Sequence, residues 1–585
     1  MKTTMHVGRN LWRPLVIFSF VLSLQLATQV AFSQDGITRY VRFSDDSGTH
    51  SGILDGNTIR VLDGDPVFDD GVSPTGSTVA VGSVDLEIPM NPERVPNVMG
   101  VAGNSNNPNG QQTDVNHPRW FGKANTSLAK NGSPVEVPYG ATNFNFEGEL
   151  GLIIGREGRH IPESEAMNYL FGVTVGNDWS ENDWCGERRG VEEPTHVFCK
   201  AGDTFATLGD AVVTGLDLTD LQISVRLNGV LAAQGTSADF RDSPASLISK
   251  ISHYVTLKRG DIIFTGTVAP PQMRGTRRQL WQEDVVEVEI ENVGAVSNQL
   301  VRVTRQNVSG PEISAADGTY VRFQYEGGTA FGVLNGNEVS ELDGDPIGGN
   351  ASMTGQTFDV SDIELGLPLD PAKPGRKVLA AAANYQPTNA PPRQVPHPRF
   401  LFKRSTSLSN DGNVVERPPE VEMFIPEGEL VLVVGRRGRH IPVNEVNDYI
   451  FGVAAGNDWS ELSWITAGPG PRPLKYVSKA TDTWAGIANQ IVRGIDYSDL
   501  QITTHVNGEL LSQGQSSTMI NNPARLVSYL SRYMTLEPGD LIYTGAISPE
   551  PGMRSNLQVG DRVTVQVEGL GSMEQQVVAM PAWPH

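Results

Sequence analysis

Short stretches in which apolar and polar residues alternate run along most of the chain. The segments 149–155 and 220–231 show the two-residue period of strands that bury one face. Asp-Gly and Asn-Gly pairs, which favour hairpins, separate many of these stretches. Helical spacing is confined to 163–172, 243–255 and their later counterparts. The pattern therefore predicts a mixed fold that β-structure dominates.

The whole pattern occurs twice. FEGELGLIIGREGRHIP, which contains Glu147, returns as IPEGELVLVVGRRGRHIP around Glu427, 280 positions later. FGVTVGNDWSE returns as FGVAAGNDWSE with the same offset, and Lys200 returns as Lys479. A repeat of this length is a duplicated domain and not a solenoid unit.

Each repeat divides into a small first part with tight turns and a larger second part. A polar stretch, QNVSGPEISAAD, separates the two repeats and is typical of a linker. We expect small β-rich N-terminal domains at 38–95 and 318–375, larger β-rich domains at 96–305 and 376–580, and the linker at 306–317.

The first residues are typical of a secretory signal peptide. Three basic residues precede an apolar run from Leu15 to Ala27, and Ala31-Phe32-Ser33 forms a small-x-small cleavage pattern. We expect cleavage after residue 33 and a periplasmic or secreted protein with no membrane attachment after cleavage. The alternative is an uncleaved anchor, against which the shortness of the run and its polar interruptions argue.

Cysteine content and charge narrow the class of protein. Cys185 and Cys199 are the two cysteines, and either a disulfide in an oxidising compartment or two free thiols fits them. Their spacing does not match a zinc site. The formal net charge of −22 without a basic stretch argues against nucleic acid as a partner.

Three carboxylates stand out in each repeat. Glu147 and Glu149 lie on the same face of a strand because side chains alternate, and Asp178 follows a second strand-like run. Like charges held this close favour a bound cation or protonation. Carboxylates without nearby cysteine or histidine favour Mg²⁺ or Mn²⁺, and Ca²⁺ fits the same donors. The alternative, a solvated strand face, does not explain why the same set recurs as Glu427, Glu429 and Asp458.

The motifs GELxLxxGRxGRHIP, YxFGVxxGNDWS and PGDLIxTG resemble the fumarylacetoacetate hydrolase family over nearly all of each repeat. The resemblance implies two tandem β-roll-type catalytic domains, each behind a small β-rich domain, which form an internal pseudo-dimer. It leaves open whether two chains associate further as a homodimer. It implies that the two carboxylate sets hold magnesium or manganese. It also implies that Lys200 and Lys479 bind and polarise the substrate and that Thr267 contacts the substrate carboxylate.

The chain departs from the family pattern at several positions. The family hydrolases carry a lid motif NYxxH, but residues 104–108 and 384–388 lack its histidine. His117 and His397 lie further along as part of a recurring HPR, where a structural role in a turn is favoured over that of a displaced base. The arginine of the family motif NDxxARD is missing from both repeats, and Ala546 replaces the counterpart of Thr267.

Together these features predict an exported, divalent-metal-dependent enzyme that acts on a small 2-oxo or 1,3-dicarbonyl acid. The reaction is C–C bond hydrolysis, decarboxylation or keto–enol isomerisation through a stabilised enolate. The missing lid histidine weakens the case for hydrolysis. The alternative is a catalytically inactive secreted protein that binds a dicarboxylate or a metal. A purely structural protein leaves the recurring carboxylates unexplained.

Overall fold

The computed structural model describes most of both repeats. It covers residues 36–105, 119–185, 196–268, 280–304, 306–387, 391–393, 395, 397–466, 476–550 and 556–581. The predicted signal peptide and His117 lie outside these ranges. Within them, no helix has the length and apolar character needed to cross a membrane.

A 13-stranded sheet forms the framework of the first repeat, in the order β4-β3-β2-β1-β15-β12-β11-β18-β6-β7 with three side strands. These strands are β1 (Thr38–Asp45), β2 (Gly48–Asp55), β3 (Thr58–Leu62), β4 (Pro74–Ala80), β6 (Val98–Ala102), β7 (Arg119–Lys123), β11 (Gly148–Ile154), β12 (Leu170–Asp178), β15 (Ala211–Thr214) and β18 (Ile262–Phe264), with β5 (Asp85–Leu86), β8 (Leu128–Lys130) and β14 (Ala206–Leu208) at the sides. Strand β1 pairs with β15, so the small N-terminal part continues the sheet of the larger part.

A second, five-stranded sheet covers one face of β11. Its order is β17-β16-β19-β20-β9, from the strands β9 (Val135–Val137), β16 (Gln222–Leu227), β17 (Val230–Thr236), β19 (Val285–Ile290) and β20 (Gly294–Arg302). Leu150 and Leu152 share a buried cluster with Val225 and Val288 of this sheet. A side chain at Gly148 would collide with both valines, at 2.5 and 2.9 Å, so the glycine between the two glutamates permits the close approach of the sheets.

The burial of β11 differs from the expectation of a half-exposed strand. All seven of its residues are buried. Leu150 and Leu152 face the second sheet, while Ile153 joins a separate cluster on the other face. A strand covered on both faces has no solvated side, so Glu149 is held inside the protein.

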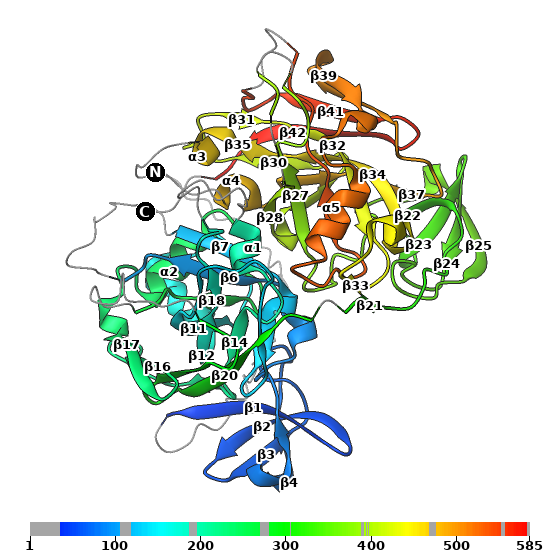
Figure 1. The fold of residues 1–585 in the computed structure, drawn as a ribbon. Helices are drawn as coiled ribbons and strands as arrows, with labels where there is room; N and C mark the ends of the chain where they lie inside the picture. The colour runs from blue at the N-terminus through cyan, green and yellow to red at the C-terminus, as the bar shows by residue number, and fades with distance from the viewer. Residues whose placement is uncertain are drawn as a thin grey trace, which may run out of the picture.

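The second repeat has the same topology. Its long sheet runs β25-β24-β23-β22-β37-β34-β32-β40-β27-β28, and its five-stranded sheet runs β30-β42-β41-β38-β39. Apart from the strands of the site, these are β22 (Gly318–Tyr325), β23 (Gly328–Asn335), β24 (Glu338–Leu342), β25 (Met353–Asp359), β27 (Val378–Ala382), β30 (Val414–Arg417), β37 (Gln490–Arg493), β38 (Gln501–Val506), β39 (Glu509–Gln515), β40 (Leu541–Tyr543), β41 (Arg562–Val567) and β42 (Gly571–Ala579). The strands of the site are β28 (Arg399–Lys403), β32 (Gly428–Val434) and β34 (Ile450–Asp458). Figure 1 shows the first repeat in blue to green and the second in green to red, with α1 (His196–Lys200) and β7 of the first lying beside β28 of the second.

Two short segments differ in detail from the sequence expectations. The segment 163–172 is a 3-10 helix, Glu163–Tyr169, after which β12 begins, whereas 243–255 contains the expected helix α2 (Pro244–Ser252). The Ser243 hydroxyl caps α2 by accepting the Ser246 N–H.

The segment between the repeats is anchored to the second one. Within 306–317, β21 (Val308–Ser309) pairs with β33 (Gly438–Arg439). The Ser309 and Tyr449 hydroxyls lie 2.9 Å apart, which adds a side-chain contact. The segment thus packs as part of the second repeat.

Candidate metal centre

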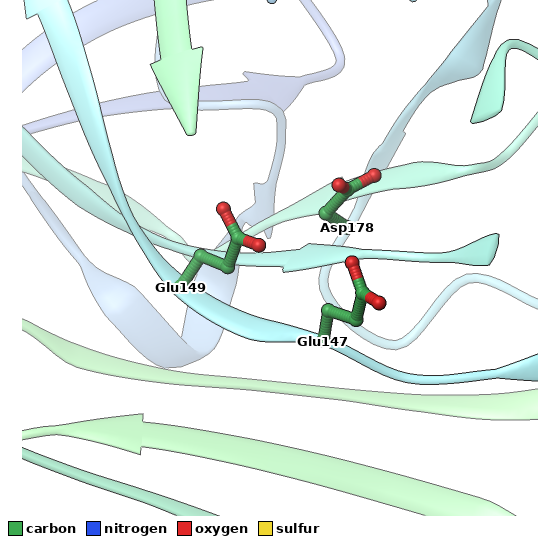
Figure 2. A group of neighbouring side chains, drawn as sticks. All are labelled: Glu147, Glu149 and Asp178. Atoms are coloured by element: carbon green, nitrogen blue, oxygen red, sulfur yellow. The ribbon is translucent and has the colours of Figure 1, made fainter. Parts of the chain in front are cut away.

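The three predicted carboxylates of the first repeat converge. Glu149 lies on β11, Glu147 directly precedes this strand, and Asp178 ends β12, which pairs with β11. The Asp178 N–H donates to the Glu147 carbonyl at 2.8 Å, which aligns the two strand ends. One oxygen from each carboxylate lies within 4.8 Å of the others, and Figure 2 shows the side chains pointing toward a common centre.

Burial makes this arrangement costly without a cation. Glu149 is 1% exposed and Asp178 is fully buried. Burial, followed by the charges of Asp178 and Glu147, raises the pKa of Glu149 well above its ordinary value of 4.5. The Gly266 N–H donates to Glu149 at 2.7 Å, but no lysine or arginine among the described residues forms an ion pair with it. Glu149 therefore needs a proton or a bound cation.

Two lysines neutralise the other carboxylates. Lys200 ends α1 (His196–Lys200), and its Nζ lies 2.5 Å from Glu147 Oε2 and 2.7 Å from Asp178 Oδ2. Lys123 on β7 forms an ion pair with the second Asp178 oxygen. Burial lowers the pKa of Lys123 to about 8, against the raising effect of Asp178. Burial also acts to lower the pKa of Lys200, but the charges of Asp178 and Glu147 outweigh burial, so the pKa of Lys200 is raised above its ordinary value.

Lys123 was not among the site residues predicted from the sequence. Its signal was present in the sequence, because Lys123 recurs as Lys403 at the same 280-residue offset as the glutamates. The fully buried Lys403 pairs with Asp458 at 2.5 Å, as Lys123 does with Asp178.

The second repeat places its residues on the equivalent elements. Glu429 lies on β32 and accepts the Gly545 N–H at 2.6 Å, and Asp458 ends β34. Lys479, on α4 (Val477–Ala480), forms ion pairs with Glu427 and Asp458. Within the described ranges, however, only the set in the first repeat brings one oxygen of each of its three carboxylates within 4.8 Å of the others.

One substitution accounts for part of this difference. In the first repeat the Ser180 hydroxyl donates to Asn182 Oδ1 at 3.1 Å. In the second repeat Leu462 occupies the position of Asn182, and the Ser460 hydroxyl donates to Glu427 instead. A carboxylate that accepts a neighbouring hydroxyl has one lone pair fewer for a metal.

Other pocket positions also differ between the repeats. Tyr385 is 3% exposed, and its hydroxyl has no hydrogen-bond partner in the described part of the chain. Burial and then the charge of Glu429 raise the pKa of Tyr385. Ser105 stands at the equivalent position of the first repeat. Thr267 follows Gly266 at the first site and is half-buried, whereas the second repeat has Ala546 there.

Several further candidates have structural roles. The Asn104 amide donates to the carbonyls of Asp242 and Thr265 and fixes two loops together. The His397 ring stacks on Tyr529 at 5.8 Å between centroids. The four tryptophans near the sites are all buried to within 5% exposure, so they contribute to the core: Trp179, Trp184, Trp459 and Trp464.

A disulfide links Cys185 to Cys199, so the structure selects the first of the two alternatives for these cysteines. Cys199 immediately precedes Lys200 on α1, and Cys185 lies shortly after β13 (Ser180–Glu181). The bond therefore ties the element that carries Lys200 to the end of the strand segment that follows Asp178.

Replacing both cysteines by serine is expected to lower the free energy of unfolding by about 3 kcal/mol, because the bond closes a loop of 14 residues. We also expect turnover at the first site to fall as Lys200 loses its fixed position. Urea unfolding and steady-state kinetics measure the two effects. The second repeat has Ile465 and Ser478 at these positions, so its metal affinity serves as an internal control. Unchanged kinetics in the variant would contradict the positioning role.

Comparison with known proteins agrees with the duplicated architecture. The model described as fumarylacetoacetate (FAA) hydrolase, C-terminal, matches residues 92–301 and 375–578, which together make up more than half of the chain. The chain belongs to the fumarylacetoacetate hydrolase family. A second model, described as Rv2993c-like, N-terminal, matches 38–89 and 319–368.

Relatives in this family include a protein that aligns with most of the chain. The 4-hydroxyphenylacetate degradation bifunctional isomerase/decarboxylase of Escherichia coli is 27% identical over 465 residues, which cover 79% of this chain and 90% of that protein. A mitochondrial oxaloacetate tautomerase of Xenopus laevis is 34% identical over 190 residues, 32% of this chain and 58% of that protein. A solved 5-carboxymethyl-2-hydroxymuconate delta-isomerase from Mycobacterium smegmatis is 28% identical, with a TM-score of 0.39 over 45% of this chain and 100% of that one.

Proposed function

We propose that this family member is a divalent-metal-dependent enzyme that acts on a small 2-oxo or 1,3-dicarbonyl acid through an enolate. The observation that carries the proposal is Glu149, a buried carboxylate that lies beside two others and has no ion pair with a lysine or arginine of the described ranges. Three carboxylates fit Mg²⁺ or Mn²⁺, and Ca²⁺ satisfies the same chemistry. Glu147, Glu149 and Asp178 would hold the ion, which when bound withdraws charge from a carbonyl oxygen.

The side chains around this centre supply the remaining chemistry. Lys200, held by Glu147 and Asp178, keeps a positive charge beside the position where the enolate oxygen develops. Thr267 provides a hydroxyl next to the backbone N–H that binds Glu149, and this hydroxyl would bind the substrate carboxylate. Lys479 has the role of Lys200 in the second repeat, where Glu427, Glu429 and Asp458 form the corresponding ligand set.

Isomerisation or decarboxylation is favoured over hydrolysis. Both reactions need a stabilised enolate, whereas hydrolysis also needs a base that activates water. Neither repeat has the lid histidine at 104–108 or 384–388 that would supply this base. The E. coli relative, which aligns with both repeats, is named an isomerase/decarboxylase.

Metal content and turnover of the purified protein test the proposal together. We expect the first repeat to bind one ion tightly and the second to bind one more weakly, with turnover of acylpyruvates, oxaloacetate or 2-hydroxydienoic acids in the presence of Mg²⁺ or Mn²⁺. Metal without turnover across this panel would favour the alternative of a metal- or dicarboxylate-binding protein. A lack of metal under saturating conditions would refute both.

We further propose that the protein acts in an oxidising compartment outside the cytoplasm. The basic and apolar pattern of residues 1–33 and the disulfide support this location. Cell fractionation with N-terminal sequencing tests it, and an intact Met1 on a cytoplasmic protein would contradict it.

A further inference from the structure

The two repeats contact each other through equivalent residues, as two subunits of a symmetric dimer do. The Thr535 N–H of the second repeat donates to Asp203 at 3.0 Å, and the Thr256 N–H of the first repeat donates to Asp482 at 2.7 Å. Two ion pairs across the boundary are also equivalent, Arg159 with Glu416 and Arg439 with Glu136. This pattern by itself would allow either repeat to pair with a copy of itself.

One pair of buried carboxylates breaks the symmetry. Asp261 of the first repeat is fully buried and receives its cation from the other repeat, because Arg404 Nη2 lies 2.9 Å from Asp261 Oδ2. The Arg404 side chain is itself fully buried. The neighbour of Asp261 within its own repeat is neutral, since Asn97 Nδ2 donates to Asp261 Oδ1 at 2.7 Å.

Asp540, the counterpart of Asp261, receives its cation from its own repeat. Lys377 stands at the position of Asn97, and its Nζ lies 2.8 Å from Asp540 Oδ2. Both side chains are 1% exposed. The preceding Arg376 donates to the Gly539 carbonyl and adds positive charge near Asp540. The first repeat contributes a buried alanine, Ala124, at the position of Arg404.

We infer that each repeat presents a surface that fits the other repeat and is mismatched to a copy of itself. In the observed pair, Arg404 neutralises Asp261 and Lys377 neutralises Asp540. Two first repeats would each offer Ala124 and Asn97 and leave both buried carboxylates without a cation. Two second repeats would place Arg404 and Lys377 on the same carboxylate. An unpaired or doubly paired buried charge is strongly unfavourable, so the partner selected by this surface is the unlike repeat.

Charge matching predicts the direction in which the unfolding midpoint of the full-length chain changes in each variant. Arg404→Met removes the cation but keeps most of the side-chain volume, and we expect the midpoint of thermal unfolding to fall by about 10 °C. Asn97→Lys supplies a cation from within the first repeat. It should lower the midpoint in the natural chain, where Arg404 is present, and raise it in the Arg404→Met background.

The reciprocal pair provides the matched control. Ala124→Arg should lower the midpoint in the natural chain and raise it in the Lys377→Asn background, because Lys377 is the lysine that pairs with Asp540 in the described part of the chain. None of the four residues is a member of a carboxylate centre, although Ala124 and Arg404 directly follow Lys123 and Lys403. The added cation could instead shift the unfolding midpoint in the same direction in both backgrounds. If both pairs gave that result, crowding and not charge matching would govern this surface, and the inference would be overturned.

Discussion

Glu149→Gln is expected to abolish metal binding in the first repeat and to leave the metal-free protein at least as stable as before. The amide removes one of three anionic ligands, so turnover from the first site should fall by at least about 100-fold. It also removes the burial penalty and, after it, the like-charge repulsion that raise the pKa of Glu149. Calorimetric titration with Mn²⁺ and thermal unfolding in EDTA measure the two effects.

The pH dependence of stability follows from the direction of this pKa shift. The pKa of Glu149 is higher in the folded chain than its ordinary value of 4.5. The contribution of Glu149 to the free energy of unfolding is therefore fully present below the ordinary pKa of 4.5, where the carboxyl group is protonated. The metal-free protein should lose this contribution as the pH rises through the higher pKa of the folded chain. The glutamine variant should lack this loss. Glu429→Gln is the matched control for the second repeat, and tight Mn²⁺ binding by the Glu149 variant at the first site would contradict the assignment.

Asp178→Asn should have the opposite effect on stability. Asp178 pairs with both Lys123 and Lys200, and the Lys123 ammonium is fully buried. Neutralising Asp178 leaves that ammonium without its anion, which costs about 3–5 kcal/mol. Urea unfolding in EDTA should show the loss.

A second substitution separates the electrostatic effect from a packing defect. Lys123→Met in the Asp178→Asn background removes the unpaired charge and should recover a large part of the stability. Asp458→Asn with Lys403→Met repeats the comparison in the second repeat, where the same ion pair is buried. If the double variant were no more stable than Asp178→Asn alone, the buried ion pair would not be the source of the effect.

The sequence was sufficient to predict the duplication and the convergence of Glu147, Glu149 and Asp178. Strand alternation places the two glutamates on one face. The recurrence of all three carboxylates in the second repeat argues against a chance arrangement. It was not sufficient to predict the burial of Glu149, because the strand pattern carries no information about the segments that cover the opposite face of β11, where Ile153 joins a separate cluster and the Gly266 N–H reaches Glu149. Gly148 was a local sign only of the five-stranded sheet on the leucine face, since a side chain there would collide with Val225.

The pattern of apolar and polar residues also could not predict which distant strands pair with each other. The pairing of β1 with β15 joins residues far apart in the chain, and nothing local to either strand specifies the partner. The same holds for Lys123 and Lys200, which meet at Asp178 from separate elements. For the cysteines, spacing left two states open, and the fold decided between them by placing Cys185 and Cys199 side by side.

The pairing of β1 with β15 also bears on how the chain can be dissected. The two family models divide each repeat between residues 89 and 92 or between 368 and 375, yet a cut there would pass through one continuous sheet. Removing 38–89 would turn β15 into an open edge with unsatisfied backbone groups, a surface prone to aggregation. Each repeat is in this sense a single folding unit, and a soluble fragment should retain its first strands.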